Sequence, residues 1–172
     1  MRKVFVGIKI SEPLRNQVYD WQKAHWDLPV RFLARQNLHI TLLPPWQIYE
    51  EDLPILKTKL SEFRGHLKPF TIYFDHISLG PNLLAPRLIW ATGETAPDLI
   101  NLKKTVENKL SLLNGDRPLK LHLTMARFKP DQFHFQLDES IRWMETVGAL
   151  ALYETIWDMA GAEYVELEKI LF

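Results

Sequence analysis

Hydrophobic and polar residues alternate in two short segments that are close copies of each other. The sequence Leu-His-Ile-Thr-Leu at 38–42 returns as Leu-His-Leu-Thr-Met at 121–125. Successive side chains of a β-strand point to opposite faces, so each segment predicts a strand with one apolar face and one face that carries an imidazole and a hydroxyl. Two such strands can face each other across a cleft.

His39 and Thr41 form the polar face of the first segment, and His122 and Thr124 form that of the second. With six histidines in 172 residues, roughly 0.3 His-x-Thr triplets are expected by chance. A single triplet is typical of an exposed strand face, where β-branched threonine is favoured and histidine is tolerated. The repetition favours a shared function for the two triplets over that simpler interpretation.

The elements that precede the two triplets repeat as well. Residues 4–10 predict a strand, and the Ser-Glu-Pro sequence after them predicts the start of a helix over about 11–25. Residues 87–92 predict another strand, and a second helical pattern begins at Pro97 and is expected to end at the Asn-Gly pair of 114–115. Order and spacing match, so we interpret the chain as an internal duplication of strand–helix–strand units.

Shorter patterns predict the elements between the repeats. A short strand is expected at 31–34, a helix from about 50 to Gly65, and a strand at 70–77. Two consecutive prolines at 44–45 are expected to stop the first His-x-Thr strand abruptly.

The part of the chain after the second triplet predicts two closing strands. They are expected at about 148–157 and 163–170, with a turn near Ala160-Gly161. Residues 133–137 alternate aromatic and other residues, but we assign them no element. The closing strands would complete the sheets.

Composition and charge limit the classes of protein that fit. The 172 residues are 47% hydrophobic, which suffices for one sizeable core or two small lobes packed together. No linker separates the halves, so we expect residues 1–172 to form a single compact domain of two interleaved lobes. Basic and acidic residues number 21 each, so a general attraction to nucleic acid is excluded and any RNA must be recognised locally.

The chain contains no cysteine, which excludes disulfides, thiolate nucleophiles and cysteine-ligated metal sites. Its N-terminus has basic and then apolar residues, but Lys9 and a Ser-Glu-Pro sequence interrupt the pattern of a signal peptide. No segment approaches the roughly 18 apolar residues that a membrane span requires. We expect a cytoplasmic protein that contacts no membrane.

The paired histidines suit a reaction that moves two protons. Near pH 7 an imidazole can take a proton from a nucleophile or give one to a leaving group. Threonine hydroxyls beside the imidazoles can donate to the oxygens of a phosphate and hold it in place. The residues therefore indicate phosphoryl transfer without a metal or another cofactor.

A metal site is the weaker interpretation of the two histidines. Stable zinc or iron sites need a third histidine or a carboxylate nearby, and the sequence supplies neither next to the triplets. The other four histidines lack a partner pattern and are assigned no role; they are His25, His66, His76 and His134.

With these two triplets the chain resembles the 2H phosphoesterases, which are named for two His-x-Thr/Ser motifs. It resembles in particular the bacterial RNA 2′,3′-cyclic phosphodiesterases, also called 2′-5′ RNA ligases. The resemblance extends over nearly the whole chain. The residues that match the family are the opening strand at 5–8, the two motifs at 37–42 and 122–127, the middle strand at 86–90, and Tyr153-Glu154-Thr155, Gly161 and Tyr164 in the closing hairpin.

The resemblance implies a bilobal α+β fold with pseudo-twofold symmetry, in which duplicated strand–helix–strand units form two antiparallel sheets that flank a central cleft. It also implies hydrolysis of a 2′,3′-cyclic phosphate to a 2′-phosphate. One of His39 and His122 would activate water and the other would protonate the departing ribose 3′ oxygen, while Thr41 and Thr124 hold the phosphate. We favour His39 as the acid and His122 as the base, although the near symmetry of the motifs leaves the reverse open.

The implied partners are RNA ends or small cyclic nucleotides, with no metal, and 2′-5′ RNA ligation is a further reaction known in the family. We expect a monomer. Two other interpretations stay open beside this one. The same cleft could bind a nucleotide or RNA without turning it over, or the enzyme could act on a different phosphate ester, such as a 2′-5′ phosphodiester or an ADP-ribose cyclic phosphate.

Arg127 and Trp46 are further candidates for substrate binding. Arg127 matches an arginine after the family's second motif and could neutralise the phosphate. Strict alternation would point it away from His122, so this role requires a bulge or a strand end; a surface arginine is the alternative.

Trp46 follows Leu-Pro-Pro where the relatives have an aromatic-Leu-Gly turn. It could stack on a base at the mouth of the cleft or pack against the lobe.

Overall fold

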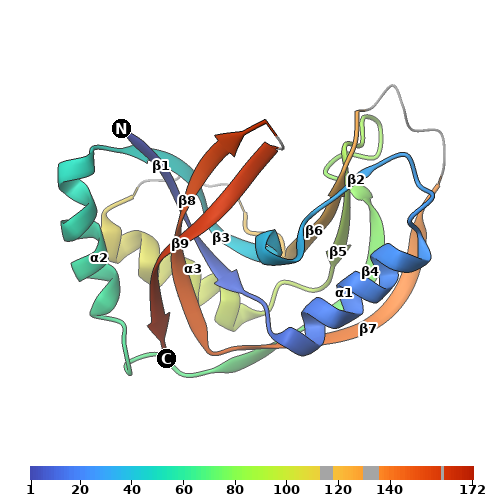
Figure 1. The fold of residues 1–172 in the computed structure, drawn as a ribbon. Helices are drawn as coiled ribbons and strands as arrows, with labels where there is room; N and C mark the ends of the chain where they lie inside the picture. Colours follow the sequence, from blue (N-terminus) through green and yellow to red (C-terminus); the bar gives the residue numbers. More distant parts are fainter. Residues whose placement is uncertain (113–117, 130–135, 160) are drawn as a thin grey trace.

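The computed structural model describes residues 1–112, 118–129, 136–159 and 161–172. These residues form two antiparallel sheets and three α-helices (Figure 1). The four-stranded sheet has the order β3 (His39–Ile48), β1 (Arg2–Lys9), β8 (Ala149–Asp158), β9 (Gly161–Leu171). The five-stranded sheet has the order β2 (Arg31–Phe32), β6 (His122–Arg127), β5 (Leu88–Thr92), β4 (Phe70–Gly80), β7 (Asp138–Val147). The predicted α+β fold with two antiparallel sheets is confirmed.

The duplication appears as two strand–helix–strand units. In the first, β1 leads through α1 (Glu12–Ala24) to β3; in the second, β5 leads through α3 (Pro97–Leu110) to β6. Both return strands pair antiparallel with the strand that opened the unit, so that Lys9 stands opposite His39 and Thr92 stands opposite His122.

The two units are interleaved through their helices. The helix α1 follows a strand of the four-stranded sheet but packs against β7 of the five-stranded sheet. Conversely, α3 follows β5 of the five-stranded sheet and packs against β3 and α2 (Leu53–Ser61) beside the other sheet (Figure 1). Neither sheet is therefore covered only by its own unit.

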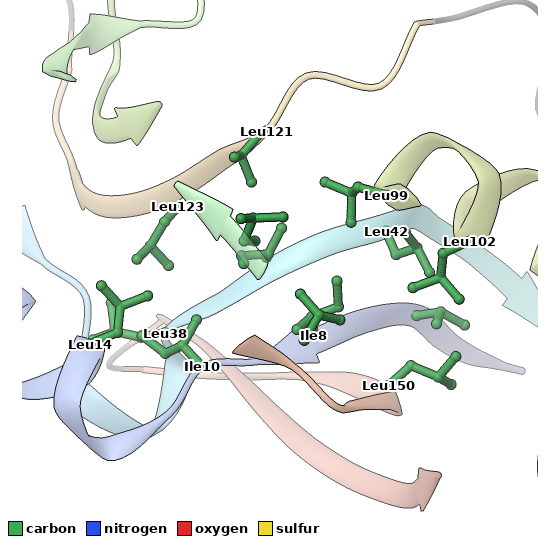
Figure 2. Close-up of a cluster of buried hydrophobic side chains, with 14 of the residues drawn as sticks. Ile8, Ile10, Leu14, Leu38, Leu42, Leu99, Leu102, Leu121, Leu123 and Leu150 are labelled. Atoms are coloured by element: carbon green, nitrogen blue, oxygen red, sulfur yellow. The ribbon is translucent and has the colours of Figure 1, made fainter. Parts of the chain in front are cut away.

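One continuous core takes side chains from both units. Leu38 and Leu42 of the first His-x-Thr segment and Leu121 and Leu123 of the second are at most 2% exposed. Figure 2 shows these four residues in one cluster that Leu14 of α1 also joins. The apolar faces of both His-x-Thr strands are thus buried together.

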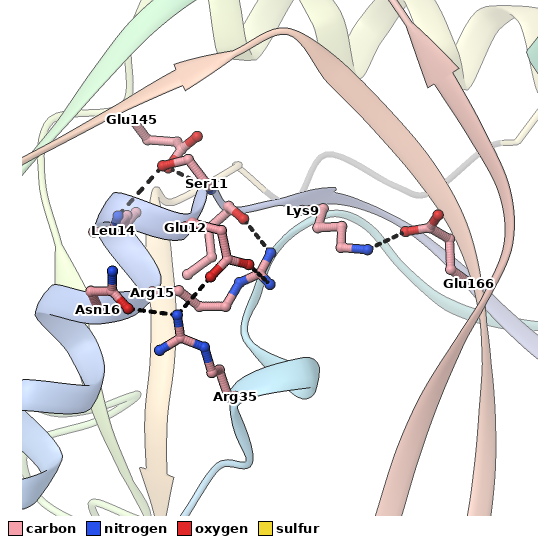
Figure 3. Close-up of polar contacts among 10 residues, drawn as sticks. Lys9, Ser11, Glu12, Leu14, Arg15, Asn16, Arg35, Glu145 and Glu166 are labelled. Carbon is pink, nitrogen blue, oxygen red and sulfur yellow. Dashed lines mark hydrogen bonds and ion pairs between the residues drawn. The ribbon is translucent and has the colours of Figure 1, made fainter.

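The helix α1 begins as its sequence predicts. The Ser11 hydroxyl caps the helix by accepting from the Leu14 backbone N–H at 3.4 Å, and Leu14, Val18 and Trp21 form its buried stripe. Ser11 also donates to Glu145 of β7 from its backbone N–H at 3.0 Å and from its hydroxyl at 2.9 Å (Figure 3). These bonds tie the start of α1 to the opposite sheet.

The strand β7 was not predicted. Its inward-facing positions include Glu139 and the buried Glu145, so carboxylates interrupt the apolar alternation by which a strand is recognised. Glu145 accepts from Ser11, and Glu139 accepts from the Trp21 indole N–H at 2.8 Å. Burial raises the pKa of the Glu145 carboxyl, and the Ser11 hydrogen bonds oppose that rise.

The prediction that Pro44-Pro45 stop the first His-x-Thr strand is wrong, because β3 continues to Ile48. The strand is at the edge of its sheet, and its register with β1 slips by one residue between Leu43 and Trp46, opposite Val6 and Val4. At an edge and at a bulge a strand residue needs no N–H in the ladder, so proline is tolerated there.

The other boundaries differ by a few residues. The predicted strand at 31–34 is observed at Arg31–Phe32, and the predicted strand at 70–77 continues to Gly80. The second helix ends at Ser61 and is followed by turns as far as Gly65, whose φ is 72°. The closing strands are confirmed as β8 and β9. The expected helix end at 114–115, residues 133–135 and Ala160 lie outside the described residues. No helix in the described ranges is long and apolar enough to cross a bilayer.

A bulge in β6 is held by a buried side chain of α1. Ala126 pairs with Ile89 and Thr124 pairs with Trp90, so Met125 is an extra residue in β6. Its carbonyl accepts from the Gln22 amide at 3.0 Å, and the same amide donates to the Leu33 carbonyl at 3.1 Å.

We expect Gln22→Met, which keeps the length of the side chain but removes both donors, to lower the free energy of unfolding by about 1–3 kcal/mol, because the buried Met125 carbonyl and the half-buried Leu33 carbonyl each lose one hydrogen bond. Urea denaturation measures the change. Gln17→Met on the exposed face of α1 is the control and should change the stability little. Equal effects of the two substitutions would contradict a supporting role for Gln22.

Candidate active site

A cavity of about 360 Å³ opens where β3 and β6 run against each other, and residues of both sheets line it. All four polar residues of the two triplets, His39, Thr41, His122 and Thr124, face this cavity. The structure therefore brings together two segments whose histidines are 83 residues apart in the chain.

The ring of His39 is fixed from several sides. Its Nδ1 lies 2.8 Å from the Asn37 carbonyl oxygen, and because a carbonyl only accepts, Nδ1 carries the proton. Its Nε2 lies 3.2 Å from the Thr41 hydroxyl oxygen. The rings of Phe5 and Tyr164 each lie 4.8 Å from the imidazole, measured between centroids. The Nε2 lone pair is thereby oriented beside the threonine.

His122 repeats this arrangement in the second unit. Its Nδ1 lies 2.8 Å from the Lys120 carbonyl oxygen. Lys120 precedes His122 by two residues, just as Asn37 precedes His39. Trp90 of the neighbouring strand packs beside the imidazole with its ring centroid at 5.3 Å. Each histidine thus donates from Nδ1 to a carbonyl of the segment just before its strand, and its ring lines the cavity.

Both imidazoles are harder to protonate than a free histidine. Burial is the main cause that lowers the pKa of His39 to about 4, and the charge of Arg127, with that of His122 when it is protonated, adds to it. Burial also lowers the pKa of His122, with contributions from Lys120 and Arg127. At neutral pH both rings are therefore uncharged in the empty cavity, and each Nε2 can accept a proton.

Arg127 lines the cavity together with the histidines. The extra residue in β6 makes this possible, because Met125 and Ala126 are two consecutive buried residues and the next side chain returns to the face of His122. The bulge that a role for Arg127 requires is therefore present.

The cavity is basic although the chain as a whole is neutral. Lys3, Arg31 and Arg127 line it, and no Asp or Glu is among the described residues in its wall. Lys3 and Arg31 were not predicted as site residues. The pairing of β2 with β6 places Arg31 there, and a long-range pairing of this kind leaves no local signal in the sequence.

The structure does not bring Trp46 to this cavity. Its ring packs against the core and lines a separate hollow with Leu56 of α2 and Leu110 of α3. This position matches the alternative in which Trp46 packs against its lobe. The mouth of the cavity instead carries the aromatic ring of Trp157 from β8, which is 67% exposed.

The other described histidines lie outside the cavity wall. His25 stacks on Trp21 with ring centroids 4.1 Å apart and approaches Glu139 at 3.1 Å, and His76 pairs with Asp75 at 3.0 Å. His134 lies outside the described residues. Within the described ranges, no three His, Cys, Asp or Glu side chains are grouped to hold a metal ion.

Chemically, the cavity combines two neutral imidazoles, the threonine hydroxyls of the two triplets and several cations. One imidazole can take a proton while the other returns one, and the cations attract an anion. The site is therefore suited to acid–base chemistry on a phosphate ester.

Comparison with known proteins identifies the class more closely. Residues 8–90 match the model of the LigT-like phosphoesterase family. An RNA 2′,3′-cyclic phosphodiesterase of Archaeoglobus fulgidus is 32% identical over 130 residues, which are 74% of this chain and 73% of the relative. The chain belongs to the LigT-like phosphoesterase family and is an enzyme of that class, which confirms the predicted 2H phosphoesterase.

Solved structures share the whole fold. The protein TT0787 of Thermus thermophilus superposes with a TM-score of 0.86 at 22% identity and covers 98% of this chain and 97% of its own. E. coli LigT complexed with 3′-AMP superposes with a TM-score of 0.78 at 22% identity and covers 99% of this chain and 98% of its own. At this identity the likeness shows the fold.

We expect the binding of inorganic phosphate to raise the pKa of His39, since an anion in the cavity favours the imidazolium. In the free protein the ring should stay neutral, with the proton on Nδ1, from pH 8 down to pH 5, because its pKa is about 4. With phosphate it should titrate within that range. Nitrogen-15 NMR of the histidine rings measures both states.

His76 is the internal reference for this titration, because its hydrogen bond to Asp75 raises its pKa. It should titrate above pH 6.5 with or without phosphate. A free protein in which His39 is half protonated near pH 6.5, the ordinary value for histidine, would contradict the prediction.

Proposed function

We propose that this protein hydrolyses the 2′,3′-cyclic phosphate of RNA ends or nucleotides to a 2′-phosphate, without a metal. The observation that carries the proposal is the matched pair of histidines, each with Nδ1 bonded to a backbone carbonyl and with its ring in the wall of one basic cavity. The activity named for the Archaeoglobus fulgidus relative supports the same substrate. We further propose that residues 1–172 act as one unit, as a monomer in the cytoplasm.

The reaction needs one base and one acid on opposite sides of the phosphorus. His122 Nε2 takes a proton from water as the water oxygen attacks phosphorus. The bond from phosphorus to O3′ breaks, and protonated His39 gives its Nε2 proton to O3′, so that the phosphate stays on O2′. Exchange of protons with solvent then restores both histidines.

The acid role requires that His39 be charged when the substrate is bound. Burial opposes that charge in the empty cavity, but a bound phosphate anion would offset the cost by pairing with the imidazolium. The substrate would thus help to create the acid that cleaves it. Thr41, Thr124 and Arg127 would donate to the non-bridging oxygens and hold the phosphate in line.

The same groups could join RNA ends. If the 5′-hydroxyl of a second RNA replaces water as the nucleophile, the same transfer of protons yields a 2′–5′ phosphodiester. Hydrolysis is the first candidate, because water is always present in an open cavity.

Removal of either imidazole should abolish most of the activity. We expect His39→Ala and His122→Ala each to lower kcat on adenosine 2′,3′-cyclic phosphate by about 10²–10⁴-fold, the usual contribution of a general acid or base. EDTA should leave the wild-type rate unchanged. Chromatography that separates adenosine 2′-phosphate from the 3′ isomer measures both rate and product.

His66→Ala, which changes a histidine outside the cavity, is the control and should keep full activity. A wild type that binds the substrate without turnover would favour a binding module. A wild type that does not hydrolyse this substrate but cleaves another phosphate ester, such as a 2′-5′ phosphodiester, would favour an enzyme with a different substrate.

The threonine hydroxyls should contribute through the bound phosphate. We expect Thr41→Val and Thr124→Val, which keep the shape of the side chain, each to lower kcat/KM by about tenfold or more, the value of one hydrogen bond to a charged group. Steady-state kinetics on the same substrate test this. Thr58→Val on the exposed face of α2 is the matched control, and an equal rate for all three variants would rule out phosphate binding by the threonines.

A further inference from the structure

Arg31 and Arg127 stand directly opposite each other on the neighbouring strands β2 and β6. Opposite residues of an antiparallel pair project from the same face, from Cα atoms about 5 Å apart. Both side chains are exposed and both line the cavity that holds the histidines. Two guanidinium groups are thus presented side by side at one wall of the site.

The same two arginines also line an adjoining cavity of about 410 Å³. Leu33, Ala162 and Tyr164 border both spaces, so the second cavity continues the first away from the histidines. Its further walls are the turn at Gln36 and Asn37, the backbone of Gly161, and Glu163, which is the one carboxylate among the described lining residues. A substrate longer than one phosphate can extend into this space.

The two arginines stand at different distances from the reaction centre. Arg127 lies on β6, the strand that carries His122, and its charge lowers the pKa of both His39 and His122. Arg31 lies on β2, the edge strand of the sheet beyond β6. Arg127 therefore faces the reacting phosphate, and Arg31 stands further out toward the adjoining cavity.

The hairpin of β8 and β9 is shaped around Arg31. A Cβ atom on Gly161 would lie 2.2 Å from an Arg31 guanidinium nitrogen, and Gly161 has a φ of +124°, which few other residues adopt. Asn37 fixes the next part of the strand by donating to the Ala162 carbonyl at 3.0 Å and accepting from the Tyr164 N–H at 3.2 Å. The start of β9 therefore approaches the guanidinium closely without displacing it.

We propose that Arg31 determines specificity by binding the phosphate one nucleotide away from the reacting one. This inference rests on the proposed function. A 2′,3′-cyclic phosphate closes the 3′ end of a strand, so the only neighbouring phosphate is attached through O5′ of the terminal nucleotide. The preferred substrates are then RNA ends and 5′-phosphorylated nucleotides, rather than cyclic nucleosides that lack a second phosphate.

The expected gain in rate is moderate. Arginine binds phosphate through charge-assisted and often bidentate hydrogen bonds, and the site is open to solvent. We expect kcat/KM to be about tenfold higher for substrates with the second phosphate.

The test compares three substrates under the same conditions: adenosine 2′,3′-cyclic phosphate, its 5′-phosphorylated form, and the dinucleotide ApA with a 2′,3′-cyclic end. The wild type should prefer the last two. Arg31→Ala should lose this preference, because its kcat/KM should fall much further for the two substrates with a second phosphate than for adenosine 2′,3′-cyclic phosphate. Arg31→Lys should retain part of the preference, because it keeps the charge but loses the planar fork.

Arg35→Ala is the matched control. Arg35 lies four residues further along, but its guanidinium turns to α1, where it contacts Glu12 at 2.6 Å and Asn16 at 2.5 Å (Figure 3). This variant should keep the wild-type preference.

The outcomes separate this inference from the proposed function. Turnover of all three substrates with no preference, or a preference that survives in Arg31→Ala, would overturn the inference alone. An equal loss for all three substrates in Arg31→Ala would place Arg31 at the reacting phosphate and would also overturn it. If the wild type turned over none of the three, the proposed function would fail and the inference with it.

Discussion

The shared burial of the two His-x-Thr strands is the constraint on which the site depends. Each strand has one apolar face, and both faces enter the same core. A slip of one residue in either strand would expose those side chains and bury an imidazole and a hydroxyl. Since each buried leucine or isoleucine contributes about 1.5–3 kcal/mol, the core holds the register, and the register points both histidines into one cavity.

The bulges change which side chains face the cavity, beyond the simple alternation of faces along a strand. The register of β3 with β1 slips at two places. At the one nearer His39, between Leu43 and Thr41, the extra residue is Leu42. The extra residue of β6 is Met125, which occupies the same position in the second repeat. After the bulge the repeats diverge, because Pro44 stands where the second unit has Arg127. The scaffold of the cavity is therefore nearly symmetric, while the bulge directs a cation into it from one side.

The same asymmetry bears on the electrostatics of the histidines. Burial lowers the pKa of both rings, and the charge of Arg127 lowers it further. The empty site thus holds neutral imidazoles beside fixed cations. In the proposed mechanism a bound anionic substrate favours the protonated form of His39. The binding of phosphate and the protonation of the acid are therefore coupled.

Local periodicity in the sequence was enough to predict the duplicated units, the buried stripe of α1 and the two His-x-Thr triplets, because each depends on residues a few positions apart. The strand β7 escaped prediction because the partners of Glu139 and Glu145 lie in and beside α1. The continuation of β3 through two prolines escaped because it depends on a sheet edge and a bulge. The places of Arg31 beside Arg127, and of Trp46 away from the cavity, were decided by pairing and packing between distant segments. Only the tertiary structure holds that information, since no spacing along the chain encodes which strands become neighbours.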